Sequence, residues 1–168
     1  GQLTNDVTAL EIKKGHWTCR LNRTGKVIGF GLLVKKSEVE FLLLGEELPV
    51  MAMIQDLNKF IISEDVVIAE LKVPFAFVLG PKSQQLADYT FSYLQDFAGL
   101  IFDLENIPLP LISSELIETY RMFAGFPLWS EISDKKFINE TMLDEFAISY
   151  QKGCFLGQET VAKIRNNR

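Results

Sequence analysis

The segment Lys152-Gly153-Cys154-Phe155-Leu156-Gly157-Gln158-Glu159 places a cysteine between glycines, after a lysine and before an amide and a carboxylate. The residues that follow carry apolar side chains at helical spacing, so we predict a short helix over 160–165. Cys154 is then expected just before a helix N-terminus, where unpaired N–H groups carry partial positive charge. That charge and the charge of Lys152 favour the thiolate over the thiol. The sulfur is therefore a candidate nucleophile, metal or cluster ligand, or redox group.

Length and composition indicate one globular domain over residues 1–168. The chain is 48% hydrophobic and 23% charged, which is typical of folded proteins. Its net charge of −5 argues against general nucleic-acid binding. Two cysteines make no disulfide framework, and we find neither a signal peptide nor an apolar run that could span a bilayer. We expect a cytoplasmic protein in a reducing compartment, with no membrane or direct nucleic-acid partner.

The first part of the chain predicts a three-stranded meander. Strands are expected over 16–22, 27–34 and 39–44, joined by polar turns. Gly29 and Gly31 interrupt the second strand and indicate a bulge or a close approach of another backbone.

The remaining pattern alternates helices and strands. Helices are predicted over 48–62, over 84–94 and from 113–115 to about 124, further strands over 66–72, 75–79 and 100–104, and a polar loop over 134–144. Hairpin strands interleaved with helices indicate an α+β fold with a largely antiparallel sheet and packed helices.

The cysteine segment, with the basic Lys163 after it, resembles the signature of the YgfZ family of folate-binding proteins. Other segments agree in the same order along the chain. Residues 2–7 resemble the family's Thr-Asn-Asp motif, 21–27 its leucine–turn–glycine hairpin, and 118–127 its arginine-then-glycine helix end. The resemblance implies the α+β folate-binding domain shared with aminomethyltransferases. It also implies a role in iron–sulfur cluster assembly or repair and in tRNA modification.

The resemblance also implies segments that this sequence lacks. A small β-barrel normally follows the signature in the family, and a longer N-terminal lead-in precedes the Thr-Asn-Asp motif. We therefore expect the chain to be a fragment of a longer protein.

Two departures from the family pattern concern acidic residues. Aminomethyltransferases carry an acidic pair after the hairpin turn, where this sequence has Gly29 and Phe30. Neither side chain can act as an oxygen general base, so we do not expect a true aminomethyltransferase. The family's arginine helix usually carries an acid that contacts the pterin, where this sequence has Phe123. A phenyl ring stacks but cannot accept hydrogen bonds from a pterin, which weakens the inference of tetrahydrofolate as a cofactor.

Candidate site residues follow from the motifs, and each has a structural alternative. The resemblance makes Cys154 the essential residue; the alternative is a buried structural cysteine. The resemblance places Asn5, Asp6, Gln158 and Glu159 at a ligand, whereas Asn5 and Asp6 could instead form a turn. Glu159 could instead pair with Lys163 along a helix. The resemblance lets Arg121 hold a folate carboxylate, although a solvated helix arginine is equally compatible with the sequence.

The motif as a whole comprises Lys152, Gly153, Cys154, Gly157, Gln158 and Glu159. Gly153 and Gly157 allow tight backbone bends and leave room for a partner close to the sulfur. The one histidine, His16, leaves little room for histidine-based chemistry, so we predict no metal site.

These observations predict that the chain is an accessory protein with a folate-binding fold, which supports iron–sulfur enzymes through Cys154. Its expected partners are iron–sulfur client or assembly proteins and a reduced folate. The alternatives are a tetrahydrofolate-dependent aminomethyl or one-carbon transferase and a scaffold that has lost ligand binding. One cysteine is too few to hold an iron–sulfur cluster alone, so a cluster would need a second chain or a small thiol.

Overall fold

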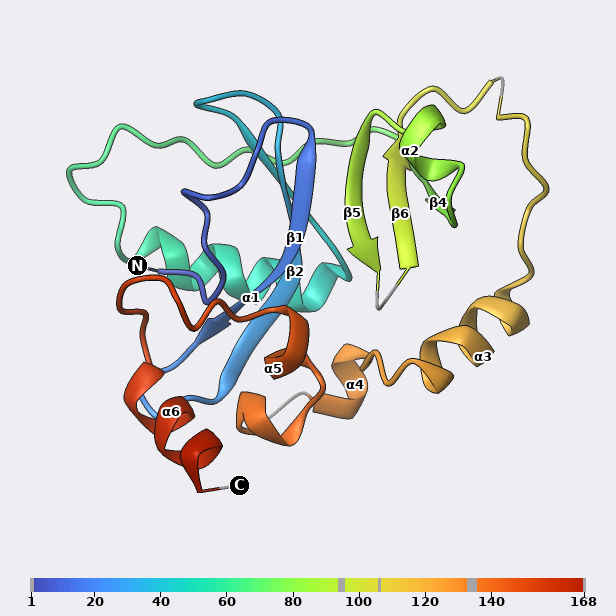
Figure 1. Cartoon of the computed structure of the whole chain (residues 1–168). Helices are drawn as coiled ribbons and strands as arrows, with labels where there is room; N and C mark the ends of the chain where they lie inside the picture. The colour runs from blue at the N-terminus through green and yellow to red at the C-terminus, as the bar shows by residue number, and fades with distance from the viewer. Residues whose placement is uncertain (1, 94–95, 106, 133–135, 168) are drawn as a thin grey trace.

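The computed structural model describes residues 2–93, 96–105, 107–132 and 136–167. A six-stranded sheet with strand order β3-β2-β1-β5-β6-β4 organises the chain. Neighbouring strands run antiparallel except β1 and β5, which pair in parallel. Helices α1 to α6 accompany this sheet, so the predicted α+β class and the largely antiparallel sheet are confirmed (Figure 1). Among the described residues, none of the helices combines the length and apolar character needed to cross a bilayer.

The predicted meander is present as β1 (Lys14–Leu21), β2 (Val27–Lys35) and β3 (Phe41–Leu44). The turn between β1 and β2 forms because the Asn22 side-chain oxygen accepts hydrogen bonds from the backbone N–H groups of Thr24 and Lys26. Gly25 takes a left-handed φ of 81° in this turn, a conformation that glycine adopts without strain.

Helix α1 (Glu47–Asn58) lies directly on β2, at the two glycines that the sequence singled out. A Cβ on Gly29 would lie 2.1 Å from the Pro49 carbonyl oxygen, and one on Gly31 would lie 2.8 Å from the Leu44 carbonyl oxygen. The predicted close backbone approach is therefore confirmed. The buried Arg20 lies against the same helix and pairs with Asp56 at 2.6 Å.

The second half of the sheet consists of β4 (Ala76–Leu79), β5 (Tyr89–Tyr93) and β6 (Asp96–Ile101). The short helix α2 (Ser83–Leu86) lies between β4 and β5 in the chain. The helix predicted over 84–94 is wrong beyond residue 86, and residue 94 lies outside the described residues. From Tyr89 onward, aromatic side chains alternate with hydroxyl side chains and favour a strand. Phe91 enters the core, and this burial outweighs the helical spacing.

Two further strand predictions in this half need correction. Residues 66–72 form no strand and no ladder with any described strand, and Val67 and Leu71 are exposed. The strand predicted over 100–104 begins earlier and ends earlier, because its register with β4 and β5 runs from Asp96 to Ile101. Short apolar runs fit several registers, and only pairing across the sheet selects one.

The C-terminal part supplies α3 (Ser114–Phe123), α4 (Trp129–Ile132), a 3₁₀ turn (Ile138–Glu140), α5 (Leu143–Phe146) and α6 (Gln158–Asn166). The Ser113 hydroxyl caps α3 by accepting the Leu116 N–H, so the predicted start of this helix is confirmed. The loop predicted over 134–144 is wrong for its described part. Ile138 and Leu143 are fully buried there, and residues 133–135 lie outside the described residues.

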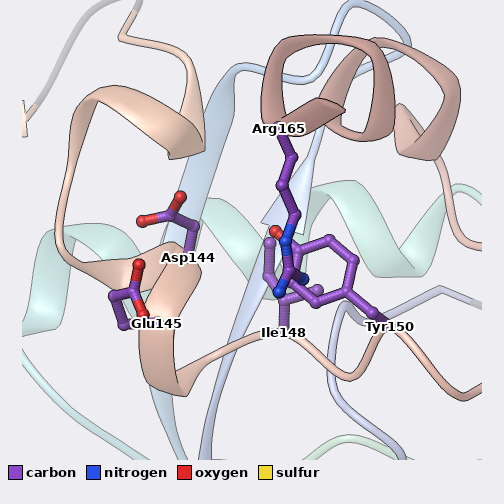
Figure 2. Close-up of a pocket in the computed structure, with 5 residues that line it drawn as sticks. All are labelled: Asp144, Glu145, Ile148, Tyr150 and Arg165. Atoms are coloured by element: carbon purple, nitrogen blue, oxygen red, sulfur yellow. The ribbon is translucent and has the colours of Figure 1, made fainter. Parts of the chain in front are cut away.

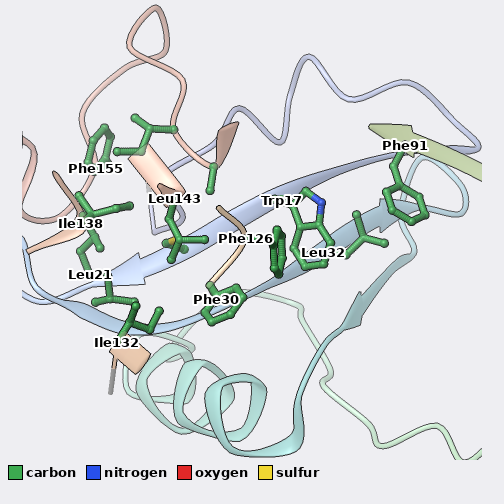
Figure 3. Packing of buried hydrophobic residues seen from close by; sticks show 14 of the residues in the cluster. Trp17, Leu21, Phe30, Leu32, Phe91, Phe126, Ile132, Ile138, Leu143 and Phe155 are labelled. Carbon is green, nitrogen blue, oxygen red and sulfur yellow. The ribbon is translucent and has the colours of Figure 1, made fainter. Parts of the chain in front are cut away.

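The hydrophobic core fills the side of the sheet opposite α1 (Figure 3). Trp17 of β1 packs edge-on against Phe126 at 4.7 Å and against Phe91 of β5 at 6.3 Å between ring centroids. In the described part of the chain, β1 and β5 pair at Lys14–Thr90 and Gly15–Phe91, and these rings add side-chain contact between the two halves of the sheet. The core then continues along α5 and α6 to Phe155, in the cysteine segment.

Candidate functional site

Cys154 lies on an exposed loop that leads into α6, and its thiol is free. The loop ends at Gly157, which caps a helix that begins at Gln158, a little before the predicted start. Phe155 is buried in the core and anchors the loop directly after the cysteine. A Cβ on Gly153 would meet no atom within 4 Å, so the surface directly before the cysteine is open. The alternative of a buried structural cysteine therefore applies to Cys19, which is fully buried, and not to Cys154.

Lys152 anchors the loop on the other side of the cysteine. Its Nζ donates to the carbonyl oxygens of Leu3 at 2.6 Å and Asn5 at 3.1 Å. Burial lowers the pKa of Lys152, while the Asp6 charge raises it. The ammonium group thus joins the N-terminal segment to the cysteine loop, and its hydrogen bonds are directed at backbone carbonyls.

Asn5 and Asp6 lie beside this lysine, so the structure brings three of the predicted site residues together. The Asn5 amide donates to the Trp17 carbonyl at 2.9 Å and its oxygen accepts the Asp6 N–H. An Asp6 oxygen accepts the Thr8 N–H and hydroxyl, and the hydroxyl bond holds the pKa of Asp6 below its usual value. Both side chains therefore make the turn and strand contacts of the structural alternative, and a ligand role stays a prediction.

Thr4 is a site residue that the sequence argument did not single out. It is 1% exposed, its hydroxyl donates to the Ala147 carbonyl at 2.6 Å, and the same oxygen accepts the Cys19 N–H at 2.8 Å. Its own carbonyl accepts the Ser149 N–H. The N-terminal segment is thus held between β1 and the chain that leads to the cysteine loop. In the sequence, the one indication of this role of Thr4 was its place inside the motif over 2–7.

Gly157 fixes how α6 meets the β1–β2 turn. Its φ is 82°, and an added Cβ would lie 2.5 Å from the Asn22 carbonyl oxygen and 2.9 Å from the Gly25 Cα. Two glycine backbones therefore meet where the motif helix docks on the hairpin. The predicted tight bend is present at Gly157.

Gln158 and Glu159 form local contacts in the first turn of α6. The Gln158 side-chain oxygen accepts the Phe155 N–H at 3.3 Å, which closes the loop. Glu159 pairs with Lys163 at 2.7 Å, and this contact lowers the pKa of the carboxyl. The helical pairing considered as the structural alternative is present.

Arg121 is buried and saturated by partners within the chain. Its five N–H donors reach Glu118, Glu131 and the Phe126 carbonyl. The hydrogen bond to Glu118 and the attraction of both carboxylates raise its pKa. The side chain is therefore no solvated helix arginine, and a folate carboxylate would have to displace one of these acids. Phe123, two residues further along α3, is 91% exposed.

The positions of the missing acidic pair are closed to a carboxylate. Gly29 lies under the Pro49 carbonyl, with no room for a Cβ. Phe30 points into the core and packs against Phe126 and Trp129. Within the described ranges, no three His, Cys, Asp or Glu side chains gather as metal ligands would.

A cavity of 190 Å³ lies between α5 and α6 and is lined by Asp144, Glu145, Ile148, Tyr150 and Arg165 (Figure 2). Figure 2 shows the two carboxylates on one side and Arg165 against Tyr150 on the other; the guanidinium lies 3.7 Å from the ring centroid. Burial raises the pKa of Tyr150. Tyr150 and Arg165 flank the cysteine loop in the sequence, but no spacing signal identified this cavity in advance.

Comparisons with known proteins name no activity. No protein-family model matches the chain. An uncharacterized protein of Haemophilus influenzae is 27% identical over 169 residues. The similarity covers 98% of this chain and 60% of that protein, so the chain spans about three fifths of its relative's length.

Proposed function

We propose that this chain acts as an accessory protein for iron–sulfur enzymes, on a folate-binding fold similar to that of the YgfZ family, with Cys154 as its functional residue. The observation that carries the proposal is an exposed, free thiol on a loop that is anchored on both sides. Lys152 ties the loop to the N-terminal segment before the cysteine, and Phe155 and Gly157 tie it to the core and the hairpin after it.

Such an arrangement suits transfer or protection chemistry on a partner protein. The anchors restrict the loop, which reduces the entropy lost when a partner binds, while the open space at Gly153 leaves the residue before the thiol uncovered. One thiolate supplies one cluster ligand, so the client protein, an assembly protein or a small thiol would supply the others. This role places the protein in the reducing cytoplasm, where both of its thiols stay free.

The alternative of a one-carbon transferase has less support from the geometry. A general base at residue 29 would require α1 to move away from β2, and a base at residue 30 would lie in the aromatic core. Burying a carboxylate there without a partner costs several kcal/mol, on the order of a domain's whole stability. A reduced folate remains part of the proposal as a ligand, without rapid turnover.

The proposal is tested in cells that lack this protein and are supplied with wild type, Cys154→Ser or Cys19→Ala. The readout is the activity of an oxygen-sensitive iron–sulfur dehydratase, normalised to the amount of that enzyme. We expect wild type and Cys19→Ala to restore activity and Cys154→Ser to leave it several-fold lower. Cys19→Ala is the matched control because it removes the other thiol.

A maleimide reagent checks the state of the thiols in the same proteins. Burial raises the pKa of Cys19, so native wild type should react at Cys154 alone and react at both cysteines after unfolding. Full restoration of the dehydratase by folded Cys154→Ser would refute the proposed role of this cysteine.

A further inference from the structure

The stretch of chain between α1 and β4 leaves a long run of residues exposed. Every residue from 62 to 75 is exposed, and Figure 1 shows this stretch as the green trace that crosses from α1 to β4. The backbone of 67–73 makes no hydrogen bond to any other described residue. The sequence predicts a strand over 66–72, so a segment with strand character is left with an unpaired backbone.

Side chains along this stretch alternate between an apolar face and a mixed face. The odd-numbered positions are all uncharged and apolar: Val67, Ala69, Leu71, Val73 and Phe75. In an extended chain, alternate side chains point to the same side. Val67 is 88% exposed and Leu71 is 61% exposed. Free backbone groups beside an exposed apolar face form a template for pairing with another strand.

Glu70 and Lys72 lie on the other face, one on each side of Leu71. They are 3.6 Å apart, and their side chains are 75% and 81% exposed. If two copies of the chain pair in antiparallel fashion with Leu71 opposite Leu71, Glu70 of each copy lies opposite Lys72 of the other. The same register sets Val67 opposite Phe75, so the apolar faces of the two strands coincide.

Other registers of this pair are disfavoured. A shift by one residue brings the apolar face of one strand onto the charged face of the other. A shift by two residues sets Glu70 opposite Glu70 or Lys72 opposite Lys72, and like charges directly opposite each other are destabilising. Both faces of the strand therefore select the register centred on Leu71. That register is symmetric, as the interface of a two-fold dimer must be.

We propose that two copies of this chain associate through residues 66–75, which pair as an antiparallel ribbon about a two-fold axis at Leu71. The occupant of this surface is a second copy because its charge pattern is complementary to itself. The ribbon leads directly into β4, which begins at Ala76 and is an edge strand of the sheet. The inference does not depend on the role proposed for Cys154.

The test is sedimentation equilibrium of the whole chain from about 1 μM to 1 mM, which measures the dissociation constant of the dimer. We expect wild type to dimerise reversibly. Glu70→Lys sets lysine opposite lysine and Lys72→Glu sets glutamate opposite glutamate, so each should raise the dissociation constant about tenfold. Both side chains are exposed, so both variants should fold.

An equimolar mixture of the two variants provides the decisive comparison. In a heterodimer of Glu70→Lys with Lys72→Glu, every lysine again lies opposite a glutamate, so the mixture should regain the wild-type dissociation constant. Arg23→Glu is the matched control, because it makes the same charge change as Lys72→Glu at an exposed residue of the β1–β2 turn. We expect it to leave the dissociation constant unchanged.

Each outcome decides the proposal. A wild-type chain that stays monomeric throughout this concentration range overturns it and leaves the segment to a different partner. Dimers that neither substitution weakens also overturn it, since association then uses another surface. Weakening in both variants without recovery in their mixture overturns the antiparallel register, because the two charges then do not lie opposite each other. Recovery in the mixture supports the proposal.

Discussion

His16 shows how burial alters one residue of β1. Its Nε2 atom is buried, and no partner for it is found among the described residues. Burial lowers its pKa to about 4, with smaller effects from Asp6, which raises it, and from Lys152, which lowers it. The unfolded chain therefore binds a proton between about pH 4 and 6.5 that the folded protein excludes.

This difference predicts a pH-dependent stability. The contribution of the neutral His16 to the free energy of unfolding is fully present above about pH 6.5 and is lost as the pH falls towards 4. We expect this loss to be about 2 kcal/mol, less than the full pKa difference would give, because part of the ring stays in contact with water. In urea unfolding at pH 7 and pH 5, His16→Gln should lose less stability than wild type on acidification. The carboxylates titrate equally in both proteins, so they do not affect the comparison. Equal losses of stability in wild type and His16→Gln would show that protonation of His16 does not destabilise the folded protein.

At the scale of elements, α6 depends on one glycine of the cysteine motif and not on the other. Gly157 has a left-handed φ and meets the backbone of the β1–β2 turn, whereas a Cβ on Gly153 meets open space. The two glycines flank the same cysteine, so they form a matched pair for separating structural from functional roles.

We therefore expect Gly157→Ala to lower the free energy of unfolding by about 2–4 kcal/mol, because it adds backbone strain and a clash with Asn22. Gly153→Ala should change it by less than about 0.5 kcal/mol. Denaturant unfolding of both variants measures the difference. A similar loss in both would mean that α6 does not dock on the hairpin through Gly157.

Across the whole molecule, side-chain packing connects the two halves of the sheet more than strand pairing does. The parallel contact between β1 and β5 spans two residue pairs, while Trp17 contacts Phe91 and Tyr93 on the other half. Phe126 packs against both Trp17 and Tyr93. Figure 3 shows Trp17 between Phe126 and Phe91.

Truncation of Trp17 should weaken the entire fold. Trp17→Ala is expected to cost about 3–5 kcal/mol, since it leaves a cavity between the halves. Val39→Ala, at a side chain that is 92% exposed, should cost less than about 0.5 kcal/mol. Thermal and denaturant unfolding followed by circular dichroism compare them. A loss below about 1 kcal/mol for Trp17→Ala would mean that other contacts hold the halves together.

The sequence by itself determined the features that depend on near neighbours. Alternation and turn residues located β1 and β2, Ser113 marked the start of α3, and Gly29 indicated a bulge or the close approach of some other backbone. The turn and cap signals are local because each acts within a few residues of the chain. The same reasoning placed Cys154 on a loop before a helix, which the structure confirms.

Only the tertiary structure decided which distant residues meet. Lys152 binds the Leu3 carbonyl 149 positions away, Thr4 binds that of Ala147, and Arg121 takes Glu131 as a partner that no spacing rule indicated. Tertiary structure also turned 89–93 from a predicted helix into β5, since pairing with β6 and burial of Phe91 outweigh local spacing. Long-range hydrogen bonds and strand register depend on how the whole chain packs, and local periodicity carries no record of them.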